Sequence, residues 1–221
     1  KPFERYALPK LYSIAPLALT GSFIGGIFVG GFFTMLPLYL LEALGSVKSL
    51  SIFMAIAILG GLVSQYPIGR LSDIYGRRKL IAFSALFSAS VSMFFLLIPS
   101  EESFLYSLGF LLGVGIFCLY PLSLARANDV FEDNKDVVEI SRALLFSYGF
   151  GSFVAPLLIG VLFRFFGFDS FFWLYFFIGL FLMFYALSKK RVADDEMSVF
   201  VSVPMTAGDV MPEFDPRQEG S

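Results

Sequence analysis

Residues 49–79 read SLSIFMAIAILGGLVSQYPIGRLSDIYGRRK, and this stretch decides the class of protein. Its first 21 residues contain no Asp, Glu, Lys or Arg, whereas its last ten contain five of them. An α-helix needs about 20 mainly apolar residues to cross the hydrocarbon core of a membrane. The stretch therefore predicts one transmembrane helix followed by a charged segment at the membrane surface.

The same alternation of apolar and charged segments continues along the chain. Six intervals of 19 to 31 residues contain no Asp, Glu, Lys or Arg: 11–41, 49–69, 80–100, 103–125, 143–163 and 170–188. Lipid offers no partner to backbone polar groups, so continuous apolar runs of this length predict helices. We expect an all-α integral membrane domain of six transmembrane helices over residues 11–190.

The composition excludes several classes of protein. Hydrophobic residues make up 57% of the chain and charged residues 15%, against about 25% charged in a typical soluble domain. With one Cys and no His, the chain can form neither an internal disulfide nor a metal site built on imidazole. We expect no cofactor and no metal. The net charge of −2 gives no reason to expect nucleic acid as a partner.

The basic residues predict the orientation in the membrane. Fourteen of the 16 Lys and Arg residues lie before the first interval, between the second and third, between the fourth and fifth, or after the sixth. Only Lys48 and Arg164 lie on the other side. Because cytoplasmic segments carry the excess of basic residues, both termini should be cytoplasmic. We expect a multi-pass protein of the inner (plasma) membrane.

Two terminal segments fall outside the six intervals. Residues 1–10 have neither an initiator Met nor a signal-peptide pattern, and we interpret them as the end of a cytoplasmic linker in a longer protein. Residues 191–221 are acidic, contain three prolines and lack an apolar period, which predicts a largely disordered cytoplasmic tail.

Small residues and prolines predict how the helices pack. The pairs Gly26/Gly30 and Gly109/Gly113 have the four-residue spacing that lets helices approach closely. A ridge of Ser84, Ser88 and Ser92 also favours close packing. Four prolines predict kinks or helix ends: Pro37, Pro67, Pro121 and Pro156.

A specific motif follows the second interval. Gly69, Asp73, Gly76, Arg77 and Arg78 give the spacing G-x-x-x-D-x-x-G-R-R. Topology rules explain the basic residues but not the glycines or the acid at these positions. Glycines permit a tight turn and close approach of helices, because they lack a Cβ. We interpret the segment as a functional loop between two helices.

This motif resembles the signature of the major facilitator superfamily, which follows the second helix of a six-helix half. Other stretches resemble the second half of its bacterial YcaD-like branch: MLPLY at 35–39, QYPIGRL at 65–71, YPLS at 120–123 and LFSYGFG at 145–151. The resemblance implies that the six helices are helices seven to twelve of a twelve-helix transporter. It also implies a partner outside this chain, the N-terminal six-helix half.

The resemblance further implies that the motif is a conformational latch. Asp73 would face the N-terminal end of a helix in the other half, where the helix dipole favours an anion. Arg77 would pair with an acid at the end of the fourth helix, for which Asp129 is the candidate. The expected latch residues are Gly69, Asp73, Gly76, Arg77, Arg78 and Asp129.

Polar residues inside the intervals are candidate contacts for a solute. In the family, the first, second, fourth and fifth helices of each half line the central cavity. On those helices the sequence offers Thr20, Thr34, Gln65, Tyr120, Ser147 and Tyr148. Hydroxyls can also bond within or between helices, so packing is the alternative role. No interval contains a carboxylate or an amine, so proton coupling would need the other half or interfacial groups.

The leading interpretation is secondary active or facilitative transport of an unidentified small solute by alternating access. A self-contained six-helix channel or carrier, and a membrane interaction protein that does not transport, are the alternatives. An intramembrane enzyme is disfavoured, because no His or in-span carboxylate could activate a Ser or Cys. The expected partners are the lipid bilayer, the other six-helix half and the solute.

Overall fold

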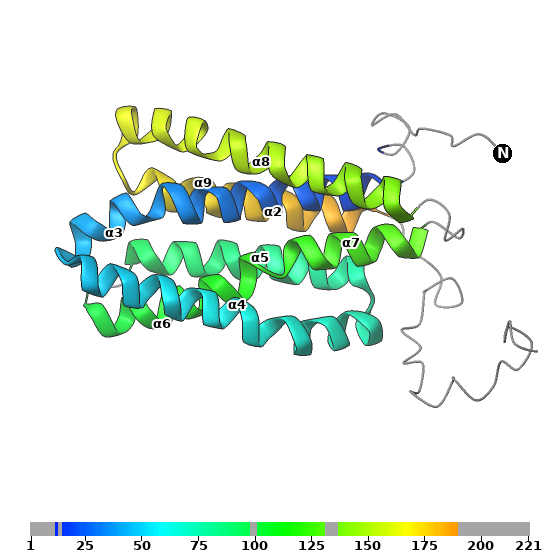
Figure 1. Cartoon of the computed structure of the whole chain (residues 1–221), viewed down its shortest axis with the longest axis horizontal. Helices are drawn as coiled ribbons and strands as arrows, with labels where there is room; N and C mark the ends of the chain where they lie inside the picture. The colour runs from blue at the N-terminus through cyan, green and yellow to red at the C-terminus, as the bar shows by residue number, and fades with distance from the viewer. Residues whose placement is uncertain (1–11, 13–14, 98–100, 131–136, 190–221) are drawn as a thin grey trace, which may run out of the picture.

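The computed structural model describes residues 12, 15–97, 101–130 and 137–189. Within these ranges the helices form one elongated bundle (Figure 1). They are α2 (Pro16–Thr34), α3 (Leu36–Leu44), α4 (Val47–Tyr75), α5 (Arg77–Leu97), α6 (Glu102–Ile116), α7 (Leu119–Val130), α8 (Val137–Phe166) and α9 (Ser170–Ser188). Counting α2 with α3 and α6 with α7, the described residues form six spans long and apolar enough to cross a membrane. The prediction of an all-α fold with six such helices is confirmed.

The six spans pack as two related sets of three. The first span, α2–α3, packs against α8, and the second, α4, packs against α6 of the fourth span. The third span, α5, packs along the sixth, α9. The first helix of each set therefore contacts the second helix of the other set, and the third helices contact each other. This is the pattern of a repeated three-helix unit.

The first, second, fourth and fifth spans each contain a proline at a matching position. These prolines lie 19 to 21 residues after the first residue of their span and are Pro37, Pro67, Pro121 and Pro156. Proline has no N–H, so the carbonyl four residues earlier loses its helical partner. The helix breaks just before Pro37, at Met35, and just before Pro121, at residues 117–118, while α4 and α8 continue through their prolines.

Glycines allow the two crossed pairs to touch backbone to backbone. A Cβ added at Gly30 of α2 would lie 2.6 Å from the Cα of Ser152 on α8. A Cβ at Gly113 of α6 would overlap the backbone of Ala57 on α4. The expectation that the four-residue glycine spacing marks close helix contacts is confirmed at both crossings.

The serine ridge lies on the buried side of α5, the helix that packs along α9. Ser88 donates to the carbonyl of Ser84 at 2.8 Å, and Ser92 donates to the carbonyl of Ser88 at 2.8 Å. Because these hydroxyls bond within their own helix, they leave a small, even surface. A Cβ added at Gly115 of α6 would collide with Oγ of Ser88, so the ridge faces a close helix neighbour. The structure thus uses the ridge for packing.

One sequence interpretation of the charged segments is wrong. The motif segment, residues 69–79, is interpreted above as a loop, but α4 continues to Tyr75 and α5 begins at Arg77, so Gly76 alone forms the turn. Charged residues mark where a helix leaves the hydrocarbon core, but the helix itself can continue into the interfacial region, where water solvates the charged side chains. The proposed linker 1–10 and tail 191–221 lie outside the described residues.

Candidate functional site

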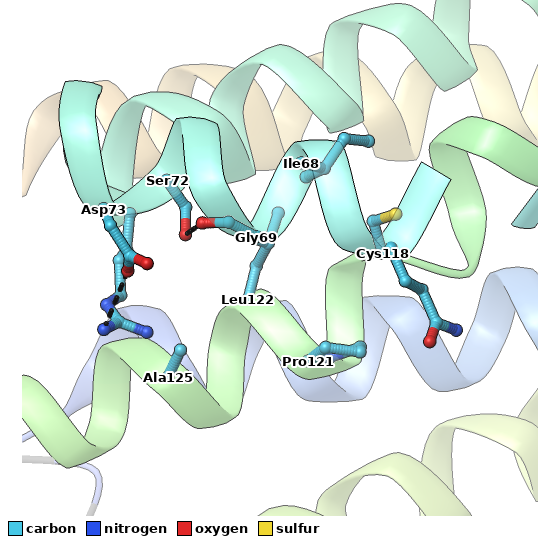
Figure 2. A pocket seen from close by; sticks show the side chains of 10 residues that line it. Ile68, Gly69, Ser72, Asp73, Cys118, Pro121, Leu122 and Ala125 are labelled. Atoms are coloured by element: carbon cyan, nitrogen blue, oxygen red, sulfur yellow. Dashed lines mark hydrogen bonds and ion pairs between the residues drawn. The ribbon is translucent and has the colours of Figure 1, made fainter. Parts of the chain in front are cut away.

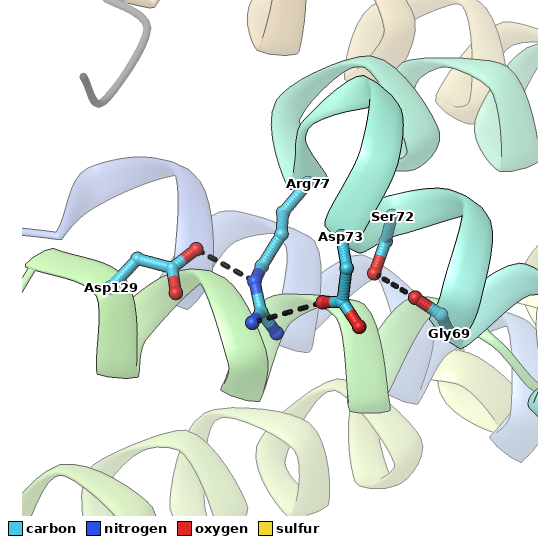
Figure 3. Close-up of polar contacts among 5 residues, drawn as sticks. All are labelled: Gly69, Ser72, Asp73, Arg77 and Asp129. Carbon is cyan, nitrogen blue, oxygen red and sulfur yellow. Dashed lines mark hydrogen bonds and ion pairs between the residues drawn. The ribbon is translucent and has the colours of Figure 1, made fainter. Parts of the chain in front are cut away.

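The motif joins two helices through one glycine. Gly76 has φ +90°, a conformation that side chains with a Cβ rarely adopt, and its N–H donates to the carbonyl of Ser72 at 3.0 Å. Ser72 is buried and donates its hydroxyl to the carbonyl of Gly69 at 2.6 Å (Figure 3). This local order places the end of α4 and the start of α5 side by side, with Asp73 and Arg77 four residues apart.

Arg77 connects three helices (Figure 3). Its Nε lies 2.7 Å from Oδ2 of Asp129 on α7, and its Nη2 lies 3.2 Å from Oδ1 of Asp73 on α4. The two acids differ in exposure, because the side chain of Asp129 is 1% exposed and that of Asp73 is 52% exposed. We call Asp73, Arg77 and Asp129 the charged cluster. One of its acids is fixed in the bundle, while the other faces outward.

The charges of this cluster stand at helix ends that disfavour them. Asp73 and Asp129 lie in the last turns of α4 and α7, where carbonyl groups give a partial negative charge. Arg77 is the first residue of α5, where N–H groups give a partial positive charge. Each placement costs about 0.3–1 kcal/mol if the charge is unpaired. The pairing of Arg77 with both acids offsets this cost.

Two further basic residues surround the charged cluster. Arg78 donates to the carbonyl of Lys189, which follows the last residue of α9, so the motif also contacts the end of the sixth span. Arg126 is buried and interacts electrostatically with Asp129, Arg77 and Arg78. Sequence reasoning missed Arg126 as a member of the site, although its position three residues before Asp129 on one helix is a usable signal.

A hollow of about 190 Å³ opens beside the charged cluster, between α4 and α7 (Figure 2). Asp73 and Arg77 line one end of it, and the predicted solute contact Gln65 also lines it. Cys118, in the break between α6 and α7, and Leu122 on α7 supply part of the wall. The structure therefore brings Gln65 to the same hollow as three of the predicted latch residues, Gly69, Asp73 and Arg77.

Two of the other predicted solute contacts meet at a second place. The rings of Tyr120 on α7 and Tyr148 on α8 have their centroids 5.0 Å apart. Both residues are partly exposed, and among the described residues neither hydroxyl has a hydrogen-bond partner. Two phenol hydroxyls without an internal partner can bind a solute.

The remaining predicted contacts do not converge with these. Ser147 donates to the carbonyl of Leu19 at 3.1 Å, and Thr34 donates to the carbonyl of Gly30 at 2.6 Å, so both hydroxyls are engaged in packing. Thr20 lies on the same helix as Thr34, and their separation of 14 positions places them about 21 Å apart along the helix.

The described residues contain no group of three His, Cys, Asp or Glu placed to hold a metal ion. What the site offers is an ion-paired cluster at one end of the bundle, a small hollow beside it, and uncharged polar side chains deeper in the spans. Such an arrangement can hold helices together and contact a solute.

Comparison with known proteins places this arrangement in a family. The model for the Major Facilitator Superfamily matches residues 18–203. The chain belongs to the major facilitator superfamily. The resemblance inferred from G-x-x-x-D-x-x-G-R-R is thus confirmed at the level of the family.

Individual members of the superfamily agree with the predicted branch. An uncharacterized MFS-type transporter of Enterobacter sp. (strain 638) is 33% identical over 142 residues, covering 64% of this chain and 36% of that protein. The uncharacterized MFS-type transporter YcaD of Escherichia coli O139:H28 (strain E24377A / ETEC) is 33% identical over 144 residues, with the same coverage. The similarity to the YcaD-like branch is confirmed, and the matched part spans 36% of these relatives' length.

Proposed function

We propose that this chain is one six-helix half of a transporter that moves a small solute across the membrane by alternating access. The observation that carries the proposal is the charged cluster, in which Arg77 ties α5 to α7 through a buried acid and to α4 through an exposed one. A latch needs such an asymmetry, since one contact must persist while another can be exchanged.

Asp73 is the proposed exchangeable member of the latch. Its side chain is 52% exposed, so its carboxylate can reach a second partner while one oxygen contacts Arg77. The partner we propose is a helix N-terminus in the other six-helix half, where an anion is favoured by about 0.3–1 kcal/mol when exposed and by up to about 2 kcal/mol when partly buried. When this end of the transporter opens, Asp73 would lose that contact and keep Arg77.

The exposed face of the bundle supports a second half as the partner. The spans α4 and α8 are the least buried. In their most apolar 18-residue stretch, 33% and 22% of the residues are buried, against 56% in the first, third and fourth spans. A Cβ at Gly69, Gly149 or Gly160 would meet nothing within 4 Å. A glycine inside a helix costs about 0.5–1 kcal/mol relative to alanine. Contacts within this chain do not explain these glycines, but close approach by a helix of another unit would. We propose that α4 and α8 form the interface with the other six-helix half.

The solute would be held by uncharged groups in this half. Gln65, Tyr120 and Tyr148 offer an amide and two phenol hydroxyls, and the spans that carry them have no carboxylate or amine at the same depth. Hydrogen bonding to a neutral or weakly polar solute fits these groups. We place the charged cluster on the cytoplasmic side, because that end of the bundle carries the basic residues.

The test uses the full-length protein that contains this chain, reconstituted in proteoliposomes. Asp73→Asn removes the exposed charge and should lower uptake by up to about tenfold. It should also raise the reactivity of Ala125→Cys, which lines the hollow beside the charged cluster. The matched control is Glu139→Gln, which removes an acid from the Arg142 ion pair at the same end of the bundle. Equal behaviour of the two variants would refute the latch.

A further inference from the structure

An apolar groove lies between α8 and α9, at the end of the bundle opposite the charged cluster. It has a volume of about 560 Å³, within the range of pockets that hold small organic ligands. The end of α8 diverges from the start of α9 there (Figure 1). Its lining includes Leu162, Phe166, Asp169, Trp173, Leu174 and Phe177.

The groove opens toward lipid and away from the interface proposed above. At 3.6 residues per turn, Leu162 and Phe166 lie about 200° and 240° around α8 from Gly160. Gly160 is on the face that we assign to the other half, so the groove is on the nearly opposite face. Both helices are apolar enough to cross a membrane, so the surface between them within the membrane faces the acyl chains of the bilayer.

Asp169 gives the groove a charge preference. It is exposed, lines the groove at the start of α9, and has no ion-pair partner among the described residues. A carboxylate at the membrane interface pairs best with a cation that can donate hydrogen bonds, because charge-assisted hydrogen bonds are stronger than neutral ones. A primary ammonium group has three such donors, a quaternary ammonium has none, and an anionic headgroup is repelled.

We propose that this groove binds one acyl chain of a phospholipid whose primary ammonium headgroup, as in phosphatidylethanolamine, pairs with Asp169. The apolar lining buries the chain, and the carboxylate selects the headgroup. Trp173 lies in the lining, so its indole would touch the bound chain.

Trp173 is the only Trp in the chain, so its fluorescence reports on the groove alone. The 221-residue chain is reconstituted in vesicles that contain phospholipids with brominated acyl chains, which quench indole on contact. Ethanolamine, choline and glycerol headgroups are compared at equal mole fractions. We expect saturable quenching that is half complete at an about 2- to 5-fold lower mole fraction for the ethanolamine lipid, the ratio an exposed ion pair gives.

Two variants separate the groove from the general lipid shell. Asp169→Asn should quench to the same extent but lose the headgroup preference. Trp173→Phe combined with Phe165→Trp moves the reporter to an exposed position at the same end, where all three lipids should quench alike. The proposal is overturned by equal midpoints in the native chain, by a preference that survives Asp169→Asn, or by absent quenching, which would mean that protein covers the groove.

Discussion

The two acids that share Arg77 should differ several-fold in what they contribute to the stability of this chain. Asp129 is 1% exposed and Arg77 10% exposed, at 2.7 Å. Removing one partner of such a buried pair costs about 3–5 kcal/mol, because the other charge stays buried without compensation. Asp73 is 52% exposed and four residues from Arg77. The two residues lie on different helices, and an exposed pair of this kind contributes about 0.2–1 kcal/mol.

The expected results follow directly from these exposures. Asp129→Asn should lower the free energy of unfolding by about 3–5 kcal/mol, whereas Asp73→Asn should lower it by at most about 1 kcal/mol. The positive charges of Arg78 and Arg126 near Arg77 add repulsion once Asp129 is neutral. The double variant Arg77→Met/Asp129→Leu removes this pair and should recover part of the stability, since apolar replacement of a buried pair is often neutral or stabilising. The recovery is partial because buried Arg126 also loses its interaction with Asp129.

The assay is equilibrium unfolding in mixed micelles with increasing dodecyl sulfate, followed by far-ultraviolet circular dichroism. A double-mutant cycle with Arg77→Met gives the coupling energy of each acid with Arg77. The reasoning requires a coupling above about 2 kcal/mol for Asp129 and below about 1 kcal/mol for Asp73. Similar coupling energies for the two acids would show that the exposure of Asp73 does not distinguish it, and the division into a fixed and an exchangeable acid would be wrong.

Four further outcomes are expected. Gly113→Leu should unfold the chain by collision with α4, whereas Gly160→Leu should leave its stability unchanged but lower transport by the full-length protein. External thiol reagents should label a Cys placed at the exposed Ser103 in intact cells but not one at the exposed Tyr75, and the reverse would overturn the orientation. Tyr148→Phe should weaken solute binding about 2- to 10-fold, measured by uptake at varied solute concentration, with unfolding unaffected. The 221-residue chain alone, reconstituted as a monomer, should show no saturable uptake.

The sequence predicted the number and type of the helices because hydropathy over about 20 residues reports burial in lipid directly. It did not predict where helices end, since a helix can carry charges once it leaves the hydrocarbon. The extension of α4 through Asp73 to Tyr75 is the clearest case. Prolines were equally ambiguous. Pro37 and Pro121 follow breaks, while Pro67 and Pro156 lie inside continuous helices, and only the packing around each decides which occurs.

Part of the site was also accessible from sequence. The resemblance implied a pair between Arg77 and Asp129, and the structure contains it at 2.7 Å. The contact of Arg78 with the end of α9 could not be inferred, because it joins residues 111 positions apart through a backbone carbonyl that no residue type specifies. The groove at Trp173 was missed for a similar reason, since its volume depends on how far α8 diverges from α9.

A latch built from charges has a physical advantage over one built from apolar packing. If stability alone mattered, apolar residues of similar volume could replace Arg77 and Asp129 at little cost or with a gain. An apolar contact, however, is costly to open into water, whereas a carboxylate that separates from a helix end is solvated at once. Asp73 is already half exposed, so little desolvation opposes its release. On this reasoning the Arg77→Met/Asp129→Leu variant should be more stable in detergent than Asp129→Asn and still lose transport in the full-length protein. The charged cluster then contributes to transport because its exposed contact separates at low free-energy cost, and not because it stabilises the fold.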